Sequence, residues 1–325
     1  MKRFTLVPNL DHVKLPEGLS VKNAIMKYME DPTVEYAEPN YIKRISTAPN
    51  DPLFNPSQQW PQGQWGLTKI NSPGAWDITA GSNNVVVAVI DSGIDFNHPD
   101  LIANIGPGVD FVANPRTSVP TDDNGHGTHV SGVIGAVGNN GIGVAGVMWN
   151  VKLMPLKFLD ENGNGFTSDE IDAIEYAITH SAKVMNASFA GPDFSFSEYN
   201  EVKQASTAGV LLMAAAGNES ANNDNPTTPS YPASFSNPAD PNLVKNGLNA
   251  LNNVISVAAT DQSDSLASFS NFGLNSVHVA APGITILSTI PTSTYGLLSG
   301  TSQATPFVSG LAGLLYSYYT NFTYS

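Results

Sequence analysis

The sequence predicts an α/β fold with a doubly wound, mainly parallel sheet flanked by helices, preceded by a small α+β segment. Apolar runs of strand length recur without polar alternation, as expected of strands buried on both faces. Helix-like segments separate several runs, and strands alternating with helices favour a parallel sheet. The runs are VVVAVI (85–90), VKLMPLKFL (151–159), KVMNASFA (183–190), VLLMAAA (210–216), NVISVAA (253–259) and VHVAAPG (277–283).

The elements are predicted in order from the N-terminus. Residues 20–31 form a short amphipathic helix that Ser20 can cap. The stretch STAPNDP (46–52) is typical of an extended linker, because its prolines disfavour regular structure. We therefore expect residues 1–48 and residues 49–325 to be two distinct parts of the chain.

Three further helices are predicted in the second part. The first of them has a capping-box start, with Thr167 followed by Glu170 three residues later. The segment SFSNPADPNLVKNGLNALN (234–252) precedes a strand-like run and is expected to be a surface loop. The predicted helices are 167–180, 196–209 and 302–319.

The composition excludes several classes of function. Of the 325 residues, 41% are hydrophobic, which is enough for a sizeable core. The chain has no cysteine, so disulfides, thiolate metal sites and cysteine nucleophiles are excluded. The formal net charge of −14 repels phosphate backbones, so no nucleic-acid partner is expected, while spare carboxylates suit calcium. No apolar run reaches ~18 residues, so no membrane span is expected, and no signal peptide is visible.

Polar side chains that can take part in catalysis or binding follow the predicted strands. In doubly wound sheets, functional groups collect at the carboxyl ends of strands. Asp91 follows the run at 85–90, and Asn218 follows the run at 210–216. Two glycine-flanked stretches stand apart from the strands, NGHGTHVSG around His126 and SGTSQATP around Ser302.

Each of these side chains also has an ordinary structural interpretation. A lone aspartate or serine commonly caps a helix, and an asparagine after a strand commonly forms an Asx turn. His126 and His129 are three residues apart, so on a helix they share a face that a metal can bridge. Together, however, a carboxylate, an imidazole and a hydroxyl are the three parts of a nucleophilic triad. An asparagine amide can add an oxyanion donor.

With these residues in place, the chain resembles a subtilisin-like serine protease, or subtilase. The resemblance rests on VAVIDSGID, NGHGTHVSG, AAAGN and SGTSQATP, and it extends from about residue 10 to the end of the sequence. It implies that Asp91 is the orienting acid, His126 the general base and Ser302 the nucleophile. Asn218 then donates to the oxyanion together with the backbone N–H of Ser302, and His129 is structural.

The resemblance also implies a zymogen. Residues 1–48 resemble a partial inhibitory pro-domain and linker, and residues 49–325 a peptidase domain that we expect to continue beyond this sequence. Self-cleavage is expected between Thr47 and Asn50, with the pro-segment acting as an intramolecular inhibitor. The family resemblance further implies a secreted, monomeric hydrolase.

The implied substrate is a polypeptide held as an added strand. One edge of its binding site is the stretch NGNG, and the other is SFAG. The end of the run at 210–216 then lines the pocket for the residue before the cut. The implied substrate-binding residues are Gly163, Asn164, Gly165, Ser188, Phe189, Ala190, Gly191, Ala215, Ala216 and Gly217.

The stretch GNNGIGVAG (138–146) resembles the calcium loop of the family. The resemblance implies ligation by the Asn140 side chain, by three backbone carbonyls and by two carboxylates, and all-oxygen ligation suits Ca²⁺. The carbonyls are those of Gly138, Ile142 and Val144, and the carboxylates are Asp51 and Asp100.

Two other interpretations of the sequence remain open at this point. The chain can be an inactive, truncated fragment of such a protease, which covalent labelling by a fluorophosphonate would distinguish from an enzyme. It can also be a metal-binding module that uses His126 and His129. Stoichiometric zinc would favour that module, and calcium would favour the enzyme.

Overall fold

The computed structural model describes residues 2–41, 47–319 and 321–324, in two compact units, Met1–Ser46 and Thr47–Ser325. In the first unit, β1 (Lys2–Arg3) pairs antiparallel with β2 (Asp11–His12), and α1 spans Val21–Met29. The predicted cap of α1 is confirmed, because the Ser20 hydroxyl accepts from the Asn23 N–H at 3.2 Å. Residues 42–46, which include Ser46 of the predicted linker, lie outside the described residues.

The second unit is built on a seven-stranded sheet in the order β4-β5-β3-β6-β7-β8-β9, with each neighbouring pair parallel. The predicted doubly wound α/β fold is therefore confirmed, and the six predicted strand runs each lie on one of its strands. A separate hairpin pairs β10 with β11. The strands are β3 (Gly81–Asp91), β4 (Val109–Asp110), β5 (Asn150–Lys157), β6 (Val184–Ala187), β7 (Leu211–Ala215), β8 (Val254–Thr260), β9 (Val279–Pro282), β10 (Ile286–Ile290) and β11 (Thr294–Leu298).

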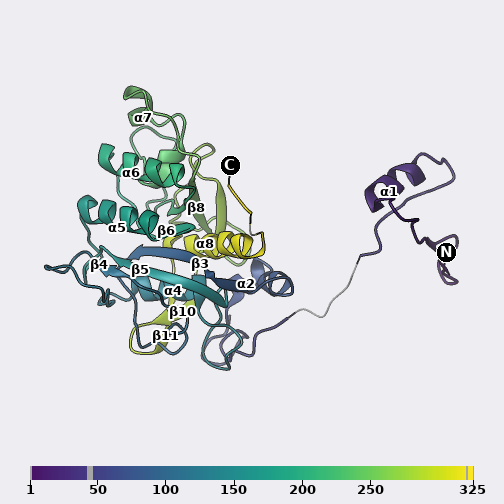
Figure 1. Ribbon diagram of the computed structural model, residues 1–325, viewed down its shortest axis with the longest axis horizontal. Coiled ribbons are helices and arrows are strands. Elements are labelled where there is room, and N and C mark those ends of the chain that lie inside the picture. Colours follow the sequence, from purple (N-terminus) through teal and green to yellow (C-terminus); the bar gives the residue numbers. More distant parts are fainter. Residues whose placement is uncertain (1, 42–46, 320, 325) are drawn as a thin grey trace. The chain divides into compact units, whose positions relative to one another are not determined.

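The second half of the central strand β3 is covered on both faces, which explains its continuous apolar sequence at 85–90. Val87 and Val89 pack into a core with residues of α4 and α8, whereas Ala88 and Ile90 pack with residues of α5 and α6. Figure 1 shows these two helical layers on either side of the sheet. The helices of this unit are α2 (Trp65–Lys69), α3 (Ser72–Trp76), α4 (His126–Gly135), α5 (Thr167–Thr179), α6 (Phe196–Thr207), α7 (Pro241–Lys245) and α8 (Thr301–Tyr318), with a 3₁₀ turn at Ala233–Ser236. No helix among the described residues is long and apolar enough to cross a membrane.

The predicted capping box of α5 is wrong. The N-cap is Phe166, which makes no side-chain cap, and Thr167 is already the first helical residue. Glu170 is 5% exposed, so its carboxyl does not reach back to the helix start but lies inside, next to the buried Glu198 of α6. Burial, reinforced by Glu198, raises the pKa of Glu170 well above its ordinary value, and burial raises the pKa of Glu198 to about 7.

The segment 234–252 is not the predicted surface loop. It contains most of the 3₁₀ turn and all of α7, and it buries Phe235 and Leu243 completely against the second core. Asp240 caps α7 by accepting from the N–H groups of Asn242 (2.8 Å) and Leu243 (3.1 Å). The sequence predicts a loop there because the apolar residues lie far apart in a stretch rich in Asn and Pro, which is the composition typical of loops.

Candidate active site

The candidate site lies at the carboxyl edge of the sheet, around the end of β3. The chain runs from β3 to β4 and β5 on one side and then crosses to β6 on the other. Loops that leave such a switch point diverge and leave room for a ligand. Asp91 is the last residue of β3, and Ser188 directly follows β6.

Asp91 and the half-buried His126 form a hydrogen-bonded pair. The Asp91 carboxylate is fully buried, and His126 Nδ1 lies 2.9 and 3.0 Å from its two oxygens. Burial lowers the pKa of His126, but the charge of Asp91, its hydrogen bond and the charge of Asp122 raise it, and the net shift is upward. With Nδ1 donating to Asp91, Nε2 is left free to accept a proton.

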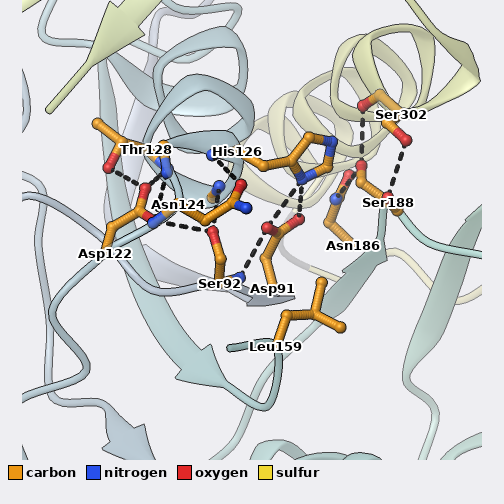
Figure 2. A network of polar contacts seen from close by, with 12 residues as sticks. Asp91, Ser92, Asp122, Asn124, His126, Thr128, Leu159, Asn186, Ser188 and Ser302 are labelled. Carbon is orange, nitrogen blue, oxygen red and sulfur yellow. Dashed lines mark hydrogen bonds and ion pairs between the residues drawn. The ribbon is translucent and has the colours of Figure 1, made fainter. Parts of the chain in front are cut away.

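Ser302 is the second residue of α8, and it is tied to Ser188 by two hydrogen bonds. Its hydroxyl donates to the Ser188 carbonyl, and the Ser188 hydroxyl donates to the Ser302 carbonyl, each at 2.8 Å. The second bond has a local cause. Pro306 lies inside the helix and has no N–H for the carbonyl four residues earlier, and Ser188 replaces that donor. Figure 2 shows the His126 imidazole between Asp91 and the Ser188–Ser302 pair. In this structure the Ser302 hydroxyl donates to the Ser188 carbonyl, so it must rotate to reach Nε2 of His126.

Two N–H donors converge beside Ser302. The side-chain oxygen of Asn218 accepts from the Thr301 N–H at 2.9 Å and the Thr301 hydroxyl at 3.0 Å, which fixes the orientation of its amide. A Cβ at Gly300 would lie 2.8 Å from Gln303 Oε1, 3.6 Å from the Ser302 nitrogen and 3.7 Å from Asn218 Nδ2. Both donors therefore lie near one point beside Gly300, where a side chain would crowd Gln303, and two neighbouring N–H donors are what an oxyanion requires.

The two histidines of the GHGTH stretch have different environments. His129 is fully buried, and its Nε2 lies 2.9 Å from the Ile286 carbonyl. Burial lowers the pKa of His129 to about 4, so it is neutral at physiological pH. Since His126 turns to Asp91 and His129 to β10, the two rings do not converge on one metal. No group of three or more potential His, Cys, Asp or Glu ligands occurs within the described part of the chain.

The first implied substrate edge is an exposed loop. Gly163, Asn164 and Gly165 are exposed, and Asp160 closes the loop by donating its N–H to the Asn164 carbonyl at 2.8 Å. A Cβ at Gly165 would lie 2.6 Å from the Phe158 side chain. Phe158 in turn makes an edge-to-face contact with Phe189 of the second edge, with ring centroids 4.7 Å apart. The two implied edges therefore share a packed aromatic base.

Two of the other implied substrate residues, Ser188 and Gly217, contact the start of α8. Ser188 contacts Ser302 directly, while Ala190 is exposed and Gly191 is half-buried. Ala215, Ala216 and Gly217 are buried, and the Gly217 N–H donates to the Thr301 hydroxyl at 3.2 Å. Because they are buried, Ala215 and Ala216 do not form part of an exposed surface.

The implied calcium residues are brought together from three segments. Asp100 accepts from Asn140 Nδ2 and from the Val144 N–H, each at 2.9 Å. Asp51 accepts from the N–H groups of Asn139 at 2.7 Å and Asn140 at 3.4 Å. Gly138, Asn140 and Ile142 lie on the same loop before β5.

The sequence interpretation missed a set of polar residues around Asp91 and His126. Asp122 is buried four residues before His126, and Ser92 links it to the Asp91 turn. Lys157, at the end of β5, donates to the carbonyls of Ser92 (2.9 Å) and Leu159 (2.8 Å). The available signal was weak, because an acidic residue shortly before a helix is also the commonest kind of N-terminal cap.

Comparisons with known proteins agree with this geometry. Residues 82–325 match the model of the subtilase family, and residues 7–40 match that of the fervidolysin N-terminal prodomain. A thermophilic serine proteinase of Bacillus sp. strain AK1 is 41% identical over 317 residues, covering 96% of this chain and 72% of that protein. Thermitase of Thermoactinomyces vulgaris is 43% identical over 269 residues, covering 83% and 85%. Subtilisin E of Bacillus subtilis strain 168 is 37% identical over 302 residues, covering 93% and 70%.

Proposed function

The chain belongs to the subtilase family, whose members are serine endopeptidases made as zymogens, and we propose that it cleaves polypeptides through an acyl-enzyme on Ser302. The observation that carries this assignment is the hydrogen bond between buried Asp91 and half-buried His126 beside a serine whose N–H borders the same point as Asn218 Nδ2. The alternative of a His126–His129 metal module is not favoured, because the two rings have separate partners.

In the proposed reaction, His126 Nε2 takes the proton of the Ser302 hydroxyl while Oγ attacks the peptide carbonyl. Asp91 keeps the proton on Nδ1 and stabilises the imidazolium that forms. Asn218 Nδ2 and the Ser302 N–H bind the oxygen of the tetrahedral intermediate. His126 then gives the proton to the leaving amine, and a water repeats the sequence to release the acyl group from Ser302.

The substrate is proposed to lie extended between two edges, 163–165 and 188–191, and to pair with them through its main chain. Main-chain pairing accepts many side-chain sequences, which suits cleavage of varied polypeptides. Residues 215–217 are proposed to border the pocket for the residue before the cut. The Ser188 carbonyl, which holds the Ser302 hydroxyl in this structure, would be released when the substrate is bound.

The N-terminal segment is proposed to inhibit the peptidase until it is cleaved. Residues 7–40 match a prodomain family, and we place the division between 1–48 and 49–325. The proposed cut lies between Thr47 and Asn50, where Thr47 is exposed. A zymogen of this kind is proposed to act outside the cell as a monomer.

Calcium is proposed to bind between Asp51, Asp100 and the loop 138–144. Asp51 is 2% and Asp100 0% exposed, and among the described residues neither carboxylate forms an ion pair with lysine or arginine. Two buried carboxylates without a cationic partner favour a bound cation. Ca²⁺ prefers oxygen ligands, and the amide oxygen of Asn140 with the carbonyls of Gly138, Ile142 and Val144 would complete the set. The ion would lock the N-terminal part of this unit to the loop before β5.

Chelation with EDTA is expected to lower the thermal stability of the peptidase unit. An ion present at about 100 times its dissociation constant contributes about 3 kcal/mol, equivalent to about 5–10 °C in Tm. The measurement is differential scanning calorimetry of the Ser302→Ala protein, which avoids self-digestion, in calcium and in EDTA. Asp100→Asn should make Tm insensitive to EDTA, while Asp261→Asn, in an exposed Asx loop, should leave the sensitivity unchanged. Equal Tm in calcium and EDTA for the parent would contradict the site.

The function itself is tested by casein hydrolysis together with labelling by a biotinylated fluorophosphonate. Hydrolysis and a single adduct, mapped by peptide mass spectrometry to Ser302, are the expected results. Hydrolysis with the adduct on another serine would reject the assignment of the nucleophile. The absence of both hydrolysis and labelling would favour the inactive-fragment interpretation.

A further inference from the structure

Asp122 makes an unusual number of hydrogen bonds for a residue outside the triad. It lies in the loop before α4 and is 6% exposed. One carboxylate oxygen accepts from the Ser92 hydroxyl (2.8 Å) and the N–H groups of Asn124 (3.1 Å) and Gly125 (2.8 Å). The other accepts from the Thr128 N–H (2.8 Å) and hydroxyl (2.5 Å). Every bond satisfies a group near Asp91 or His126, as Figure 2 shows.

On one side, Asp122 fixes the start of the helix that carries His126. The N-cap of α4 is Gly125, which has a left-handed φ of 104° and no side chain to cap the helix. The Asp122 carboxylate takes over this role by binding N–H groups both before and after His126. The backbone from which the imidazole extends is therefore held at two points.

On the other side, Asp122 fixes the turn that follows Asp91. Ser92 donates its hydroxyl to Asp122 and accepts from the Gly127 N–H at 2.9 Å. The Ser92 N–H donates to Asp91 Oδ1 at 2.7 Å. One serine thus connects the orienting carboxylate, the helix with the base and Asp122. Both ends of the Asp91–His126 hydrogen bond depend on the same buried anion.

We propose that Asp122 is a positioning residue of the peptidase reaction, which holds Asp91 and His126 in register and whose charge stabilises the imidazolium of His126. This inference rests on the proposed function of the site. It assigns Asp122 no contact with substrate. Its effect is exerted through the geometry and the charge of the Asp91–His126 pair.

The charges around His126 predict the sign of the electrostatic effect. Asp91 from β3 and Asp122 from the loop before α4 both raise the pKa of His126, against the lowering effect of burial. His129, on α4 itself, is neutral because burial lowers its pKa to about 4. On β5, Lys157 donates to Asp123 at 2.6 Å, so its charge is compensated. Removing the Asp122 charge should therefore lower the pKa of His126.

The test compares Asp122→Asn and Asp122→Glu with wild type and with Asp240→Asn. Asp240 is a matched control, because it is a fully buried aspartate that caps a helix, α7, and touches no residue of the site. Steady-state kinetics on a soluble peptide substrate are measured across pH 5–9, roughly the range over which an imidazole titrates. Active sites are counted by fluorophosphonate titration, so unfolded or unprocessed protein does not enter kcat.

For Asp122→Asn we expect kcat to fall by about 10–100-fold with little change in KM, because the geometry of the base is disturbed and substrate contacts are not. The acid limb of the kcat/KM profile should move to lower pH. Asp122→Glu keeps the charge but displaces the carboxylate, so kcat should fall while the acid limb stays at its wild-type pH. Asp240→Asn should keep both wild-type values.

The proposal is overturned if Asp122→Asn matches Asp240→Asn in kcat and in the position of the acid limb. If Asp122→Asn does not fold, Ser92→Ala takes its place. This substitution breaks the link between the Asp91 turn and α4 and keeps the negative charge of Asp122. A kcat reduced with an unmoved limb then supports the proposal, and an unchanged kcat rejects it. Inactivity of the wild-type enzyme itself would be a failure of the proposed function.

Discussion

Replacing Ser302 with alanine is expected to reduce peptide turnover by about 10⁶-fold, the loss measured when the nucleophile of a subtilisin is removed. The substitution removes Oγ and leaves Asn218, the backbone N–H and His126 in place, so residual hydrolysis would come from binding and the oxyanion donors alone. Turnover is measured on casein and on a short peptide with purified protein. KM is expected to change little, because Oγ does not carry substrate binding.

Ser317→Ala is the matched control for this prediction. Ser317 is on the same helix, and its hydroxyl donates to the Leu314 carbonyl at 2.7 Å, away from the site. The control should retain wild-type turnover and a shortened N-terminus, whereas Ser302→Ala should keep the full-length mass. A Ser302→Ala protein that still processes itself to wild-type mass, with no other protease present, would contradict the proposed mechanism.

Replacing Glu198 with glutamine is expected to stabilise the protein at alkaline pH. Burial raises the pKa of Glu198 from 4.5 to about 7, so between those values the unfolded chain loses a proton that the folded protein keeps. The stability from this group is therefore fully present below pH 4.5 and is lost as pH rises through about 7. A shift of this size corresponds to about 3 kcal/mol.

The glutamine side chain is neutral at every pH, and it can donate to Glu170, one of whose oxygens has no partner among the described residues. We therefore expect Glu198→Gln to be more stable than its parent by about 3 kcal/mol at pH 8, with the difference shrinking toward pH 4. The measurement is urea unfolding at a series of pH values in the Ser302→Ala background. Glu175→Gln, an exposed glutamate on α5, is the control and should follow the parent curve. Coincident curves for Glu198→Gln and parent would reject the buried-pair interpretation.

The main features of the fold follow from the order of apolar runs. β7 and residues 85–90 of β3 are covered on both faces, so these stretches are continuously apolar and easy to recognise. Helix boundaries were less secure, because capping depends on where the side chain can go. Thr167 and Glu170 have the spacing of a capping box, but Glu170 is taken into the interior by its packing against α6. A pattern of neighbouring residues does not show whether the Glu170 side chain caps the helix or packs against a distant one.

The segment 234–252 shows the same limit for composition. Its prolines and asparagines resemble those of an exposed loop, yet Phe235 and Leu243 are fully buried and Asp240 caps a helix. Hydrophobic burial depends on the surface that neighbouring elements offer. Here that surface belongs to a core that includes Met154, Met185 and Tyr199, which are far away in sequence.

The sequence by itself determined the fold class, and it predicted the four residues of the candidate site, because their motifs are local and lie near strand ends or helix starts. Only the tertiary structure decided how these residues are held. The Ser188–Ser302 pair joins residues 114 positions apart, and Asp122 reaches Ser92 across 30 positions. Such contacts arise from the parallel sheet, which brings distant strand ends to one edge, and hydrogen bonds there depend on distance in space rather than along the chain.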